Sequence, residues 1–152
     1  MCEHCGCQAL QTIDELTREH DVALGHVRTA ELAAAAGDLP GAVAACAALD
    51  RLLVPHSTVE EEAVFPALAR EYPEHVAGLV DEHRVVHGAL AELAAAGTDD
   101  PWASGLLHAL AVLRAHIDKE QDGLFPASLS SLTTADWEAA ERVRRRVGST
   151  AF

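Results

Sequence analysis

Histidine and glutamate recur four residues apart along this chain, and that spacing constrains the fold more than any other feature. The pattern comprises a single histidine, two His-x3-Glu pairs and one His-x3-His pair. In chain order its members are His20, His56 with Glu60, His83 with His87, and His116 with Glu120. On an α-helix, residues four apart lie one turn apart on the same face. Four helices carrying these groups would therefore supply five imidazoles and two carboxylates, the ligand set of a two-metal centre.

Turn-forming residues divide the chain into segments with helical periodicity. Clusters that contain Gly, Pro or Asp interrupt it at 37–41, 72–73 and 97–101. The sequence predicts helices over roughly the following residues: 9–36, 41–70, 74–96, 101–127 and, shorter, 134–147. No alternating run rich in Val, Ile and Thr predicts a strand. Short connections between long helices indicate an all-α fold, an antiparallel up-down-up-down four-helix bundle with a short C-terminal fifth helix.

The predicted fifth helix has a polar beginning and a cationic end. Thr133 and Thr134 are candidate N-caps. Four arginines stand near its end, at positions 142, 144, 145 and 146. Cations at a helix C-terminus suit the helix dipole, so we interpret these arginines as a solvated helix end without a ligand.

An internal repeat supports a pseudo-symmetric arrangement. Residues 56–67 and 116–127 align with an offset of 60 and share the His, the Glu and a Phe-Pro-Ala end. The Glu-His pairs at 19–20 and 82–83 match likewise, 63 residues apart. The chain therefore looks like two copies of a helical hairpin, which would build a pseudo-symmetric site on their shared axis.

These motifs resemble the hemerythrin family, including its bacterial members, the HHE cation-binding domains. The similar stretches occur in the expected order and read LTREH, HSTVEEEAVFP, DEHRVVH and HIDKEQDGLFP, within about residues 10–127. The resemblance implies a non-haem di-iron site, two Fe ions with an oxo or hydroxo bridge. It would place the protein ligands as follows: His83, His87 and His116 on one iron, His20 and His56 on the other, and Glu60 and Glu120 bridging both.

The two halves of the predicted site differ in one ligand. His87 of the second copy aligns with Leu24 of the first, so one metal receives three imidazoles and the other two. The second metal then keeps an open position, which a small ligand such as O₂, H₂O₂ or NO requires. Animal hemerythrins carry an Asp five residues after the last His. Here that position is Gln121, and Glu120 is the carboxylate that would take its place.

The resemblance favours a protein that binds O₂ or a related small oxidant for sensing, delivery or storage. One alternative is an enzyme in which the same centre decomposes peroxide, as a catalase or peroxidase does, or reduces NO. Another is iron sensing or buffering. The sequence leaves open which of these applies, and with it the redox partner and the oligomeric state.

The net charge limits the partners that we expect. It is −13, and the sequence pI is about 4.9. Nucleic acids and anionic membranes both attract basic surfaces, so neither is an expected partner. No run of 18 or more apolar residues predicts a membrane span, and the first residues lack the basic and apolar regions of a secretory signal. A cytoplasmic location is therefore the expectation.

Three of the four cysteines lie in the first seven residues, at Cys2, Cys5 and Cys7, with His4 among them. Thiolates at this spacing could bind a second metal or cycle as a redox pair, serving the di-iron centre or a partner chain. The alternative is a flexible reduced tail. We expect residues 1–8 to form a Cys-rich segment and residues 9–152 the bundle with its C-terminal helix. Cys46 stands alone and is expected to be a small buried hydrophobe.

Overall fold

The computed structural model describes residues 6–97, 99 and 101–152 of the chain, and its regular elements are all helical. In chain order they are α1 (Cys7–Ala35), α2 (Leu39–Val59), η1 (Glu60–Val64), α3 (Phe65–Leu68), α4 (Pro73–Ala94), α5 (Trp102–Lys119), η2 (Glu120–Leu124), α6 (Phe125–Ser131) and α7 (Thr134–Val147), where η denotes a π-helical turn. The described residues contain no strand. The prediction of an all-α fold is confirmed for this part of the chain.

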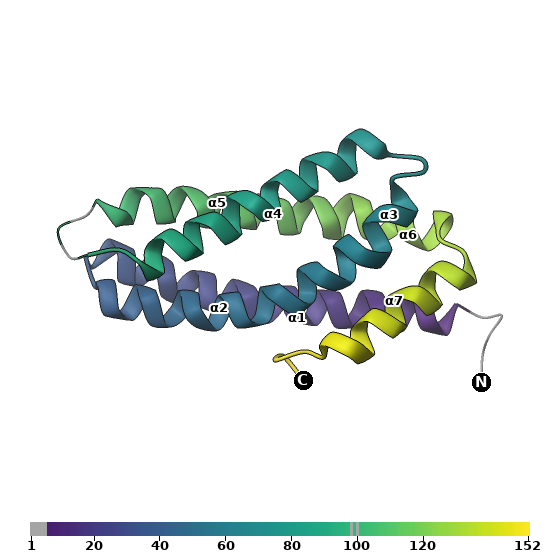
Figure 1. Cartoon of the computed structure of the whole chain (residues 1–152), viewed down its shortest axis with the longest axis horizontal. Helices are drawn as coiled ribbons and strands as arrows, with labels where there is room; N and C mark the ends of the chain where they lie inside the picture. The colour runs from purple at the N-terminus through teal and green to yellow at the C-terminus, as the bar shows by residue number, and fades with distance from the viewer. Residues whose placement is uncertain (1–5, 98, 100) are drawn as a thin grey trace.

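The long helices lie side by side along the longest axis of the molecule (Figure 1). Helix α1 contacts α2 and α5, and α4 contacts the same two helices, so the four close a ring around a common interior. Helix α7 lies obliquely along the side of the bundle, near one end, against α1, α2 and η1. Its N-cap is Thr133, one of the two residues expected in that role.

A tight turn between α1 and α2 makes these two helices direct neighbours. Gly37 has a φ of 67°, in the left-handed region that glycine adopts more readily than other residues. The Asp38 N–H donates to the carbonyl of Ala33 at 2.9 Å and so closes the end of α1. The Asp38 side chain accepts from the Gly41 N–H at 3.0 Å and caps α2. The chain therefore reverses within a few residues.

Buried hydrophobic side chains form two clusters, one in each half of the bundle. The first includes Ala23, Leu53, Val86 and Ile117, and the second includes Leu16, Val59, Leu79 and Phe125. Between members of the two clusters along the chain stand His20, His56, His83 and Glu120. The predicted ligands thus form a polar layer between two apolar cores.

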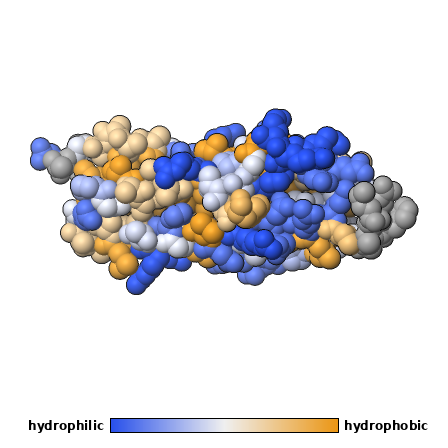
Figure 2. All heavy atoms as spheres, turned by 90° about the horizontal axis from the view of Figure 1, so that it is seen from below, coloured by the Kyte–Doolittle hydropathy of each residue, from blue (hydrophilic) through white to orange (hydrophobic). Residues whose placement is uncertain are grey.

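Hydrophilic and apolar residues are also unevenly distributed over the surface. Figure 2 shows hydrophilic residues gathered on the right half of the face seen from below, and more apolar ones on the left half. Among the residues that the structure describes, no helix combines the length and the hydropathy needed to cross a membrane.

Candidate metal centre

Both glutamates of the His-x3-Glu pairs begin a π-helical turn. In η1 and η2 the N–H of the phenylalanine that follows the turn donates to the carbonyl of Glu60 or Glu120, five residues earlier. A proline follows each phenylalanine, Pro66 in one repeat and Pro126 in the other. In a regular α-helix the proline ring would clash with the carbonyl four residues earlier, and the wider turn avoids that clash. The repeated Phe-Pro therefore fits the widening of both helices at the glutamate.

Side chains from the long helices meet in one buried cluster. Four imidazoles and two carboxylates take part, and none is more than 6% exposed. Their ligand atoms form two groups, each within 4.8 Å: His20, His56, Glu60 and Glu120, and Glu60, His83, His116 and Glu120. Both glutamates belong to both groups. The structure therefore brings together six of the seven residues that the sequence predicted as ligands.

The Glu60 carboxylate lies between imidazoles of the two groups. Its Oε1 is 3.0 Å from Nε2 of His56, and its Oε2 is 3.2 Å from Nε2 of His83. One oxygen thus faces each group, which is the disposition of a carboxylate shared by two metal ions.

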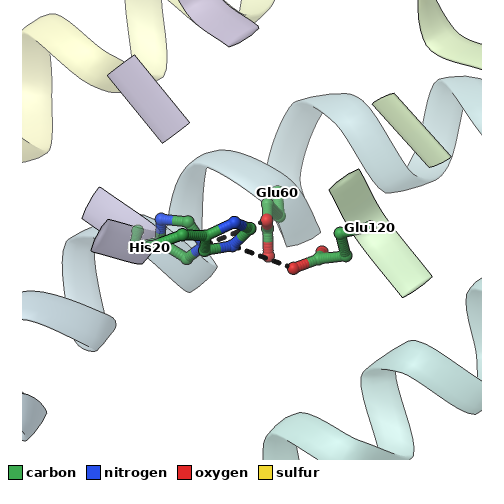
Figure 3. Close-up of side chains that lie close together, drawn as sticks. His20, Glu60 and Glu120 are labelled. Carbon is green, nitrogen blue, oxygen red and sulfur yellow. Dashed lines mark ion pairs between the residues drawn. The ribbon is translucent and has the colours of Figure 1, made fainter. Parts of the chain in front are cut away.

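The Glu120 carboxylate also contacts both groups, but through one oxygen. Its Oε1 is 3.2 Å from Nε2 of His20 and 3.1 Å from Nε2 of His116. Figure 3 shows His20 and Glu120 turned toward one another, with Glu60 beside them. Carboxylates from two π-helical turns therefore converge on the same point.

Each of the four imidazoles forms a hydrogen bond through its Nδ1 atom. The acceptors are Gln121 Oε1 for His20 at 2.9 Å, Glu19 Oε1 for His56 at 3.1 Å, Glu61 Oε1 for His83 at 3.0 Å, and Glu82 Oε1 for His116 at 3.1 Å. An ionised carboxylate can only accept, so Nδ1 carries the proton in the three histidines that face one. Nε2 is then left to bind a metal, as in most metal-ligating histidines.

Several buried polar atoms of this cluster lack a hydrogen-bond partner among the described residues when the imidazoles are neutral and carry their proton on Nδ1. They are Nε2 of His20 and all four carboxylate oxygens of Glu60 and Glu120. Leaving such groups unsatisfied costs about 1–3 kcal/mol each, and more when they are charged. Imidazole and carboxylate suit borderline divalent metals such as iron, manganese and zinc. The residues present therefore fit a pair of such ions, which would use the unpaired atoms.

Nearby carboxylates control the charge of the imidazoles. Burial alone would lower the pKa of His56, but Glu60 and other carboxylates outweigh it and raise the pKa to about 10. Burial would also lower the pKa of His116, but Glu120 and other carboxylates outweigh it and raise the pKa to about 9. Burial would raise the pKa of Glu60, but His56 and His83 hold it well below its usual value. Without metal, the centre thus holds imidazolium–carboxylate pairs.

His87 lies outside both ligand groups. Its Nε2 is 3.3 Å from Oγ of Ser57, and its Nδ1 is 3.6 Å from Oδ1 of Asp50. It nevertheless lines, with the other four predicted histidine ligands, a cavity of about 10 Å³ beside the centre. Its role as a third imidazole on one metal stays a prediction.

The sequence interpretation of Arg144 as part of a solvated helix end is wrong. Its side chain is 11% exposed, and its guanidinium donates to both carboxylate oxygens of Glu19, at 2.5 and 2.9 Å. A signal was present in the sequence, because Trp137, Ala140 and Arg144 share one face of a helix. Trp137 and Ala140 are buried on that face, whereas Arg145 is exposed, as expected.

The cysteines are only partly covered by the structure. Cys2 and Cys5 lie outside the described residues, and Cys7 is exposed at the beginning of α1. The second metal or redox site therefore stays a prediction. Cys46 is buried in the first core cluster, and burial raises the pKa of its thiol to about 11. The expectation of a small buried residue at this position is confirmed.

Comparison with known proteins gave one family match. A family model described as the hemerythrin HHE cation-binding domain matches residues 11–128. This range contains every residue of the two ligand groups and stops before α7. No curated protein and no solved structure gave a significant match.

Proposed function

Because the chain belongs to the hemerythrin HHE cation-binding domain family, we propose that it holds two iron ions and binds O₂ or a related small oxidant. The family match confirms the resemblance seen in the four sequence motifs and supports a metal-binding role. The observation that carries the proposal is the pair of fully buried carboxylates, Glu60 and Glu120, set between two pairs of imidazoles.

The proposed ligand assignment follows the two groups. His20 and His56 would hold one ion, His83 and His116 the other with His87 as a third imidazole, and Glu60 and Glu120 would be shared. Two ferrous ions held there would supply the electrons that binding or reduction of a small oxidant requires. The chain itself contributes oriented imidazoles, since each of the four in the ligand groups has its Nδ1 fixed by a neighbouring side chain.

The cavity beside the centre favours a very small ligand. Its volume of about 10 Å³ is roughly that of one water-sized probe. Apolar side chains form much of its lining, among them Leu53, Val86, Leu113 and Ile117. A very small molecule suits such a space better than an organic substrate, which supports a small oxidant as the ligand.

We also infer an antiparallel up-down-up-down order for the helices, with residues 9–152 as one unit and residues 1–8 as a separate Cys-rich segment. The tight turn after α1 supports this order, as do the contacts of α2 with both α1 and α4. Short connections require consecutive helices to lie side by side and antiparallel.

Elemental analysis and the visible spectrum of protein prepared without oxygen test the proposal. We expect two iron ions per chain, and a coloured form that appears when O₂ is added and fades on degassing. A His56→Ala variant should lose both, while a His108→Ala variant, which changes an exposed histidine, should keep both. Zinc in place of iron would contradict the iron assignment. Rapid irreversible oxidation would contradict reversible binding, and release of O₂ from added H₂O₂ would instead favour the peroxide-decomposing enzyme.

A further inference from the structure

Two glutamates in matching positions of the repeat hold imidazoles of neighbouring helices. Glu19 accepts from Nδ1 of His56 and Glu82 from Nδ1 of His116, each at 3.1 Å. Each glutamate also pairs with a cation, Arg144 for Glu19 and Lys119 for Glu82. The halves differ in burial, because the Glu19 side chain is fully buried whereas the Glu82 side chain is 20% exposed beside an exposed lysine. The His56 side of the centre is therefore the enclosed one.

Among the described residues, the other side chains that hydrogen-bond to the Glu19 carboxylate, besides His56, belong to the C-terminal segment. Oε1 accepts from Arg144 at 2.5 Å, and Oε2 accepts from Arg144 at 2.9 Å and from the Ser149 hydroxyl at 2.8 Å. The Arg144 Nε lies 3.1 Å from a carboxylate oxygen of Glu15, one turn earlier on α1. The Glu19 carboxylate is thus fixed between an imidazole of the centre and the end of α7.

Helix α7 lies outside the region that the family model matches, yet its Arg144 contacts Glu19, which holds an imidazole of the candidate centre. Its buried residues, Trp137 and Ala140, join the second core cluster, and the helix lies along α1 and α2 (Figure 1). Arg144 follows Ala140 by one turn on the same side of the helix. Packing of that side therefore brings the guanidinium to Glu19.

We propose that Arg144 positions the His56 imidazole through Glu19, so that docking of α7 and metal binding by His20 and His56 support each other. The guanidinium offers two donors in a fixed fork, which holds the carboxylate in one orientation. The carboxylate in turn fixes Nδ1 of His56 and leaves Nε2 directed at the centre. This coupling is reciprocal by thermodynamic linkage, so metal binding must favour docked α7 as much as docked α7 favours metal. The inference rests on the proposed ligand assignment.

Variants at Arg144 test the inference through two measurements on the full chain. The first is the affinity for each of two ferrous ions, by anaerobic competition with a chelator. The second is hydrogen exchange of residues 134–147 with and without ferrous ion. In Arg144→Gln we expect one ion to bind about 10–100-fold more weakly while the other is unchanged. Ferrous ion should slow exchange in α7 of the wild type but not in α7 of this variant.

Three further variants separate positioning from general stability. Arg144→Lys keeps the charge but not the fork, so we expect partial recovery of the weakened ion. Ser149→Ala removes one hydrogen bond to Glu19 and should give a smaller loss in the same direction. Arg145→Gln changes the exposed neighbour and should match the wild type. If Arg144→Gln does not fold, Arg144→Lys and Ser149→Ala carry the comparison, and unchanged affinity in both overturns the inference.

A purely structural role predicts different results. The coupling would be overturned if Arg144→Gln lowered the affinity for both ions equally. It would also be overturned if ferrous ion did not change hydrogen exchange in α7 of the wild type. Wild-type protein that binds two ions, with an Arg144→Gln variant that binds them equally well, would contradict this inference and leave the proposed function intact. Wild-type protein that binds no ferrous ion would overturn both.

Discussion

Gln121 stands where animal hemerythrins carry a carboxylate, and the structure gives it a different part to play. Its Oε1 accepts from Nδ1 of His20 at 2.9 Å. The preceding residue, Glu120, lies 3.2 Å from Nε2 of the same imidazole. Adjacent residues of η2 therefore contact opposite nitrogens of His20. The amide orients the ring, and the carboxylate contacts the nitrogen that would bind a metal ion.

Glu60 belongs to both ligand groups and turns one carboxylate oxygen toward each. In a Glu60→Gln variant, the amide lacks the negative charge that lets both oxygens face a metal ion. We expect the iron content to fall from two ions per chain to one or none, because both ligand groups contain this residue. Iron measured after gel filtration checks this. Glu92→Gln, at an exposed position of α4, is the control and should keep two ions. Full retention by Glu60→Gln would rule out the shared role.

The raised pKa values of His56 and His116 predict how the metal-free protein responds to pH. An imidazolium stabilised by folding contributes fully below the pKa of the unfolded state, near 6.5. That stability is lost as the pH rises through about 9 for His116 and about 10 for His56. We therefore expect the thermal midpoint of chelator-treated protein to fall between pH 7 and pH 10. Circular dichroism melts measure it, and a midpoint that rises over this range would contradict the assignment.

Residue spacing could predict which atoms meet at the centre, but not what holds them there. Positions four apart share a helix face, so His56 with Glu60 could be assigned from the sequence alone. The Nδ1 partners come from other helices, as with Glu19, 37 residues before His56. Such pairings depend on how the helices dock against one another. The same reason explains why the ion pair between Arg144 and Glu19 was missed.

At the scale of elements, helical periodicity predicted the segments well and their interior poorly. The sequence predicted a single helix over residues 41–70. The structure instead has three consecutive elements over residues 39–68, namely α2, η1 and α3. Periodicity does not distinguish an α-turn from a π-turn over five residues, because each position shifts only slightly. The Phe-Pro pair after each glutamate was the available signal, since a proline inside a helix favours local widening or a kink.

The beginning of α7 is set by a capping box that one substitution should weaken. Thr133 Oγ1 accepts from the Asp136 N–H at 3.2 Å, and the Asp136 carboxylate accepts from the Thr133 N–H at 2.9 Å. We expect Thr133→Ala to lower the free energy of unfolding by about 1 kcal/mol. Chemical denaturation measures the loss. Thr134→Ala, at the next and equally exposed position, should be close to neutral. Equal effects of the two changes would show that the cap contributes nothing.

For the whole molecule, the polar layer divides a core that would otherwise be continuous. Apolar clusters lie on both sides of it, and helices α1, α2 and α4 contribute to each. Between them the carboxylates of Glu60 and Glu120 are fully buried among imidazoles. Burying these charges is costly even where imidazolium ions pair with them. Metal binding therefore acts on the stability of the entire bundle, not only on its own ligands.

Metal removal should consequently lower the stability of the whole fold. A ligand present at about 100 times its dissociation constant adds roughly 2.7 kcal/mol to the folded state. For a chain of this size that corresponds to a midpoint about 5–10 °C higher. We expect a chelator to reverse this shift in iron-loaded wild-type protein, as followed by scanning calorimetry. The double variant Glu60→Gln with Glu120→Gln lacks both shared carboxylates, so the chelator should not change its thermal midpoint. Equal sensitivity of the two proteins would mean that the stabilising ion binds elsewhere, because only the wild type keeps the carboxylates that both ligand groups need.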